Sequence, residues 1–97
     1  MNEVKKQEVV VNFPQDFKGG SYANNMMVHH SKDEFVMDFI MLSPPSGMVV
    51  SRVISSPAQM KRVMHALQEN IAKYEQKFGS IENYEIPQGD IGFATKQ

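Results

Sequence analysis

The chain of 97 residues contains no cysteine. Disulfides, thiolate metal sites and a cysteine nucleophile are therefore all excluded. A chain without cysteine fits a reducing compartment, and we expect a cytoplasmic protein.

Long apolar runs and an excess of one charge are also missing. No run of 18 apolar residues occurs, and the first residues are polar and charged, so we expect neither a membrane-spanning helix nor a signal peptide. Ten basic and eleven acidic side chains give a formal net charge of −1. This balance provides no overall attraction to nucleic acid or anionic lipid, so binding of either would need a local patch.

Catalytic and metal-binding patterns are sparse. There is no P-loop, no dinucleotide-binding glycine pattern and no His-Glu-x-x-His motif. His65 has no carboxylate or serine at a spacing that identifies a catalytic partner. His29 and His30, followed by Asp33 and Glu34, suggest a metal site, but neighbouring strand residues point to opposite faces. We therefore expect no catalytic residue, no metal and no cofactor, and hence no enzyme.

The sequence does contain three β-prone segments separated by turn residues. They run from Tyr22 to His30, from Glu34 to Leu42 and from Met48 to Ser55, and the breaks between them are Ser31–Asp33 and Ser43–Gly47. Their succession predicts an antiparallel meander. A fourth β-prone run, Val9 to Phe13, ends at Pro14 and is a candidate edge strand.

A helix with clear end signals follows the last strand. Ser56 suits the N-cap, Pro57 the first turn, and Gln59 can complete a capping box. Gly79 suits a left-handed C-terminal cap, so the helix should end near Phe78. The predicted fold is α+β: a three- or four-stranded antiparallel meander sheet followed by one long amphipathic helix. We expect an N-terminal tail at 1–20, a single domain at 21–80 and an irregular tail at 81–97.

The second hairpin has a predicted register. If Ser43–Gly47 forms the loop, Leu42 faces Met48 and Asp38 faces Arg52. We expect Asp38 and Arg52 to form a structural cross-strand ion pair that controls the register, in preference to a functional polar site.

Both faces of this hairpin are apolar, although an antiparallel sheet with one wet face should alternate. One face carries Val36, Ile40, Leu42, Met48, Val50 and Ile54. The other, the candidate interface, carries Phe35, Met37, Phe39, Met41, Val49 and Val53. Because one helix covers only one face, the second needs another subunit, the terminal segments or a bound polypeptide. A homo-oligomer, with a dimer first, is the simplest solution.

The helix is amphipathic, with apolar residues at three- and four-residue steps. The residues at 60, 64, 67, 71, 74 and 78 also fit a/d heptad positions. We favour packing onto the chain's own sheet over helix pairing. The basic residues of the helix are Lys61, Arg62, His65, Lys73 and Lys77. A solvated face is favoured for them over phosphate binding.

Four blocks of the sequence together resemble a known family. They are Tyr22–Asn24, Ser31–Phe39, Val50–Pro57 and Ala66–Gly79. They are similar to the small prokaryotic family catalogued as domain of unknown function 3467, over about residues 22–81, with both tails outside. The resemblance implies a single-domain bacterial or archaeal protein of uncharacterised role.

Three functional hypotheses follow. The leading one is a non-enzymatic homo-oligomeric module that docks a protein partner or an extended polypeptide, of which a chaperone-like binder is one version. The alternative is a nucleic-acid-associated regulator that uses the basic helix face of a dimer, and the near-zero charge disfavours it. The third is an enzyme whose active site is assembled at a subunit interface.

Overall fold

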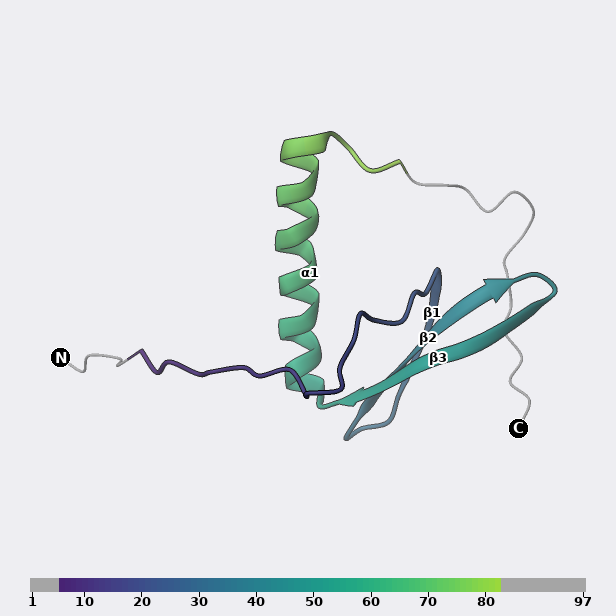
Figure 1. Cartoon of the computed structure of the whole chain (residues 1–97), viewed down its shortest axis with the longest axis horizontal. Helices are drawn as coiled ribbons and strands as arrows, with labels where there is room; N and C mark the ends of the chain where they lie inside the picture. The colour runs from purple at the N-terminus through teal and green to yellow at the C-terminus, as the bar shows by residue number, and fades with distance from the viewer. Residues whose placement is uncertain (1–5, 83–97) are drawn as a thin grey trace. The chain divides into compact units, whose positions relative to one another are not determined.

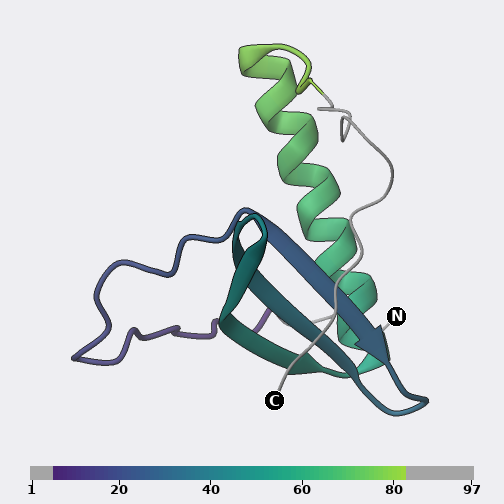
Figure 2. The ribbon, with the colours of Figure 1, turned by 90° about the vertical axis from the view of Figure 1, so that its right-hand side faces the viewer.

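The structure is a computed structural model, and it describes residues 6–82. Three strands and one helix follow one another: β1 (Asn25–His30), β2 (Phe35–Ser43), β3 (Ser46–Ser55) and α1 (Pro57–Phe78). The strands form one antiparallel sheet in the order β1-β2-β3, so β2 is central (Figures 1 and 2). The α+β meander with one C-terminal helix is confirmed, with three strands among the described residues.

The described chain divides into two compact units. The sheet unit contains residues 6–30 and 36–54, and the helix unit contains residues 31–35 and 55–82. The helix unit thus includes the turn between β1 and β2. In this turn the N–H of Ser31 donates to the Glu34 carbonyl over 2.9 Å.

β1 begins at Asn25, later than predicted, because the side chain of Asn24 makes the hydrogen bonds to β2 that the backbone of a longer strand would make. The Asn24 N–H donates to the Ile40 carbonyl over 3.1 Å. Its side-chain amide then binds both backbone groups of Leu42: Nδ2 donates to the carbonyl over 2.9 Å, and Oδ1 accepts from the N–H over 2.7 Å. One side chain therefore continues the bonding pattern of the edge strand onto β2.

The candidate edge strand at Val9 to Phe13 does not form. Residues 6–24 contain a turn, in which the Phe17 N–H donates to the Pro14 carbonyl over 2.9 Å, and no strand. The rings of Phe13 and Phe17 pack across this turn with centroids 5.4 Å apart. A β-prone run that ends at a proline and meets no partner strand gains no ladder hydrogen bonds.

The connection between β2 and β3 is shorter than the predicted five residues. Only Pro44 and Pro45, joined by a cis peptide bond, lie between the strands. Gly47 lies so close to β2 that a Cβ there would come within 3.1 Å of Leu42 Cδ1 and 3.2 Å of Ile40 Cγ2. A glycine at this position thus allows the strands to approach right up to the turn.

α1 has the predicted ends. Ser56 Oγ accepts a hydrogen bond from the Gln59 N–H over 3.1 Å, and Pro57 starts the first turn. Gly79 ends the helix as predicted and donates its N–H to the Glu75 carbonyl over 2.9 Å, but with φ 96° and ψ 171° it does not adopt the predicted left-handed helical conformation. These signals are local in sequence, which is why they locate the helix correctly.

The core of the described chain is small and lies on β2. Its buried apolar side chains are Met37 and Ile40, and Asp38 between them is buried as well. A central strand is flanked on both sides, so its residues are the first in a small sheet to lose contact with water. Large apolar side chains are exposed on β1, β3 and α1.

Candidate functional site

Asp38 and Arg52 form a two-pronged ion pair between β2 and β3. Arg52 Nε donates to Asp38 Oδ1 over 2.6 Å, and Nη2 donates to Oδ2 over 2.8 Å. The two ends differ in burial, since the Asp38 side chain is 2% exposed and that of Arg52 58% exposed. The carboxylate belongs to the core, whereas the guanidinium reaches the surface.

The pair fixes the charge of both groups. The hydrogen bonds from Arg52 hold the pKa of Asp38 below its ordinary value, although burial acts in the opposite direction. The positive charge of Arg52, and to a smaller extent His29, lowers this pKa further. The same hydrogen bonds raise the pKa of Arg52. Neither group can exchange a proton near neutral pH, which suits a structural pair better than acid–base chemistry.

The histidines are not gathered with carboxylates into a ligand set. His29 and His30 lie exposed at the end of β1, and His65 lies on α1 in the other unit. Within residues 6–82 no group of three or more histidine and acidic side chains has a geometry that could hold a metal ion.

The residues of the candidate interface differ in exposure. Met41, Val49 and Val53 are exposed, whereas Phe35 and Phe39 are half-buried. Met37 lies on the central strand and is buried within the chain, where it forms part of the core.

β3 is an apolar edge strand. It is ten residues long, and the sheet order leaves one of its sides without a neighbour among the described residues. Met48, Val49, Val50, Val53 and Ile54 are exposed along β3. An edge of this kind presents unpaired backbone groups beside apolar side chains, which is the arrangement that another chain can extend.

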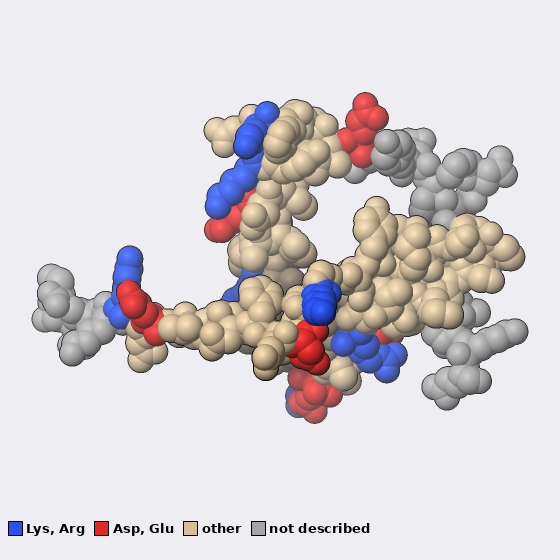
Figure 3. All heavy atoms as spheres, viewed as in Figure 1, with Lys and Arg blue, Asp and Glu red and all other residues tan. Residues whose placement is uncertain are grey.

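Charge is nearly absent from this part of the molecule. Arg52 is the one lysine or arginine in the three strands, and Asp38 already pairs with it. Figure 3 shows an uncharged surface, on the face in view, at the end of the sheet that carries the β2–β3 turn. Such a surface suits an apolar protein segment better than a phosphate backbone.

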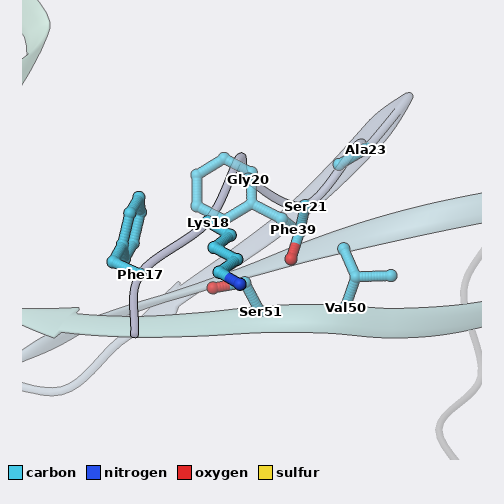
Figure 4. Close-up of a pocket in the computed structure, with 8 residues that line it drawn as sticks. All are labelled: Phe17, Lys18, Gly20, Ser21, Ala23, Phe39, Val50 and Ser51. Atoms are coloured by element: carbon cyan, nitrogen blue, oxygen red, sulfur yellow. The ribbon is translucent and has the colours of Figure 1, made fainter. Parts of the chain in front are cut away.

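A hollow of about 520 Å³ lies within the sheet unit. It is lined by Phe17, Lys18, Gly20, Ser21, Ala23, Phe39, Val50 and Ser51. In Figure 4 the Lys18 side chain reaches toward Ser51, and the Ser21 hydroxyl points into the same space beside the Phe39 ring. Apolar walls with one amine and two hydroxyls can hold a small apolar group with an anionic end.

Residues 17–23 therefore cover part of the β2–β3 surface. Terminal segments are one cover that we expect from the sequence, but the sequence pattern does not single out residues 17–23. The available signal was Phe17 followed by Gly19 and Gly20, an apolar anchor before a flexible joint. Gly19 adopts φ 61°, a backbone conformation that glycine reaches without strain.

On α1 no residue is buried, and its apolar residues form an exposed stripe. The basic residues Lys61, Arg62, His65, Lys73 and Lys77 lie outside this stripe. With 100° per residue, however, Glu69 falls in the middle of the basic arc. A phosphate backbone would meet this carboxylate between the cations, which weakens the case for nucleic acid.

Comparison with known proteins identifies the family. The model of the family described as Protein of unknown function (DUF3467) matches residues 1–83. The chain belongs to this family. Searches of curated proteins and of solved structures returned no match.

The extent of the family match corrects one expectation. It begins at residue 1, so the N-terminal tail is not outside the family, and the match includes residues 17–23, which line the hollow. No helix within residues 6–82 has both the length and the apolar character needed to cross a membrane.

Proposed function

We propose that this member of the DUF3467 family is a non-enzymatic homo-oligomeric module that docks a protein partner on its sheet. The observation that carries the proposal is a contrast within residues 6–82: two apolar side chains are buried, whereas apolar side chains are exposed on every strand and on α1. A chain of this length buries only a small hydrophobic core when it folds alone. Large exposed apolar surfaces mark sites of interaction with other molecules.

Self-association is the first part of the proposal. The sheet unit and the helix unit each carry exposed apolar surface, so one chain provides more than one contact region. A two-fold dimer uses the same surface on both copies and therefore needs no second gene product. Burial in the dimer would supply the apolar contacts that the single chain lacks.

Docking of an extended polypeptide along β3 is the second part. Strand addition joins backbone groups at a free edge, while side-chain contacts on the two faces select the sequence. β3 offers both: one edge has no neighbouring strand among the described residues, and Met48, Val49, Val53 and Ile54 are exposed. The low charge of the strand favours an apolar segment, such as a partly unfolded chain would present.

The mass in solution tests self-association. Sedimentation velocity at micromolar concentration should give a species larger than the 11.0 kDa monomer. A monomer that also fails to bind a hydrophobic dye would overturn the proposal, because its apolar surfaces would then be neither buried nor available.

A labelled peptide that copies residues 46–55 tests docking. It should bind the wild-type protein, and the same peptide with proline in place of Val50 should not, since proline removes a backbone donor. Replacing both Val49 and Val53 by Lys should abolish binding, whereas the matched pair Val9→Lys and Val11→Lys, in the N-terminal segment, should not. Equal binding to all variants would exclude β3 as the docking strand.

A further inference from the structure

α1 carries an exposed apolar stripe along its length. The stripe consists of Met60, Met64, Leu67, Ile71, Tyr74 and Phe78, and all of them except Met60 are strongly exposed. We infer that α1 pairs with the α1 of a second copy in antiparallel orientation, held in register by Lys61 and the partner's Glu75. This inference rests on the proposed self-association and names the surface that performs it.

An antiparallel pair brings all six stripe residues into contact in one register. In heptad terms Met64, Ile71 and Phe78 are at a positions, and Met60, Leu67 and Tyr74 are at d positions. Antiparallel helices place each a residue against a d residue of the partner. With Leu67 opposite the partner's Ile71, every other stripe residue also finds a stripe residue opposite.

In that register methionine side chains lie opposite aromatic side chains. Met64 lies opposite the partner's Tyr74, and Met60 lies opposite the partner's Phe78. Flexible thioethers thus meet aromatic rings, a contact that is favourable in its own right. The rings of Tyr74 and Phe78 already pack together, with centroids 5.0 Å apart, and present one aromatic surface to the partner. Parallel helices would instead stack Phe78 on Phe78 and Met60 on Met60.

Charge selects the same orientation. The e positions beside the stripe are Lys61, Gln68 and Glu75, and antiparallel helices place e positions against e positions. Lys61 then meets the partner's Glu75, twice by symmetry, and Gln68 lies near the partner's Gln68. In parallel helices Glu75 would lie beside the partner's Asn70, and no opposite charges would meet.

Both charged residues are available for this contact. Lys61 is exposed on the second turn of α1. Glu75 is half-buried, and its Oε2 accepts a hydrogen bond from the Ile81 N–H over 2.8 Å. A carboxylate accepts more than one hydrogen bond, so Glu75 can bind Lys61 of the partner while it holds Ile81.

Charge reversal tests the pairing. Lys61→Glu and Glu75→Lys should each weaken dimerisation about tenfold, because two exposed ion pairs become two like-charge contacts. The double variant should recover most of the affinity, and an equimolar mixture of the two single variants should form mixed dimers. Glu75→Gln, which keeps an acceptor for Ile81, separates the loss of that hydrogen bond from the loss of charge.

Matched controls lie on the outer face of the same helix. Arg62→Glu and Glu69→Lys make the same charge changes on the side of α1 opposite the stripe, and we expect less than a twofold effect on dimerisation from each, since these positions lie outside the helix–helix contact. The reversals at 61 and 75 also place a negative charge nearer the helix N-terminus and a positive one nearer the C-terminus. The macrodipole favours both changes, so loss of the dimer could not be ascribed to an unstable helix.

Cysteine cross-linking reads the orientation directly, since the chain has no cysteine of its own. In antiparallel helices Met64→Cys and Tyr74→Cys should form a disulfide only when the two variants are mixed. Each variant alone should not cross-link, because its two cysteines would lie about 15 Å apart along the helix axis, beyond the reach of a disulfide.

The outcomes separate the inference from the proposed function. A dimer in which Met64→Cys alone cross-links has parallel helices, and a dimer indifferent to charge reversal and without cross-links uses another surface. Either result overturns the inference and leaves self-association intact. A wild-type monomer overturns both.

Discussion

At the scale of single residues, the Asp38–Arg52 pair is asymmetric. Its carboxylate is buried and its guanidinium is mostly in water. Removing Arg52 therefore leaves a buried charge without a partner, while removing Asp38 leaves an exposed arginine that water can solvate. Breaking a pair by deleting the partner of its buried member is the costly case.

The first prediction follows from this asymmetry. Arg52→Met should lower the free energy of unfolding more than Asp38→Asn does, and the variant with both changes should be more stable than Arg52→Met alone. Urea unfolding at neutral pH and fixed protein concentration measures all three. Equal losses for the two single variants would mean that Asp38 is better solvated than its burial implies.

The pH dependence should change sign between wild type and Arg52→Met. In the wild type the pKa of Asp38 is lowered from its ordinary value of 3.8, so its contribution is present above that value and is lost as the pH falls through the folded-state pKa. Without Arg52, burial raises this pKa, and stability should decline as the pH rises above 3.8 until the folded-state pKa is passed. Unfolding curves from acid to neutral pH compare the slopes, and parallel slopes would contradict this account.

Asn24 carries the third prediction. Asn24→Ala removes two neutral hydrogen bonds to the backbone of Leu42 and should cost roughly 1–3 kcal/mol of unfolding free energy. Amide exchange at Leu42 should accelerate with it. The control is Asn25→Ala, because the Asn25 side chain accepts a hydrogen bond from the N–H of its neighbour Met26 and, within residues 6–82, none from another strand. If Leu42 stays protected in Asn24→Ala, the backbone of β1 must have replaced the lost side chain.

At the scale of elements, the sequence predicts the helix better than the strand ends. The bounds of α1 follow from Ser56, Pro57 and Gly79, all of which act on the backbone next to them. The start of β1 depends on a contact between Asn24 and Leu42, 18 residues away. The β2–β3 loop was overestimated because the serines and Gly47 around the prolines are turn formers in general and strand residues here.

The fourth prediction concerns the start of α1. Ser56→Ala removes the acceptor of the Gln59 N–H and should cost about 1 kcal/mol. Ser80→Ala, just beyond the other end of the helix, makes the same chemical change without a capping bond and serves as the control. Chemical denaturation compares the two variants, and equal stability would mean that the first turn finds another acceptor.

At the scale of the whole molecule, alternation along β2 and β3 predicts two apolar faces, and apolar side chains are exposed on both strands. It does not predict that Met37 is buried while Val53 is exposed, because that difference follows from strand order. The periodicity of apolar residues does not predict the hollow beside Phe39, since Phe17 and Lys18 line it from a segment without regular secondary structure. A surface that a second chain covers is harder still to predict from a single sequence, because its contacts are not made within the chain.

The last prediction joins stability to association. If the exposed apolar surfaces are buried between copies, folding and association are coupled, and the midpoint of thermal unfolding must rise with protein concentration. A tenfold increase in concentration is worth about 1.4 kcal/mol per dimer, which shifts the midpoint by roughly 3–6 °C for a dimer of this total length. Calorimetry across about two decades of micromolar concentration measures the shift. Lys61→Glu should show the same shift but with lower midpoints throughout, because its dimer is weaker. A wild-type midpoint that does not depend on concentration would mean that the chain folds alone in spite of its small core.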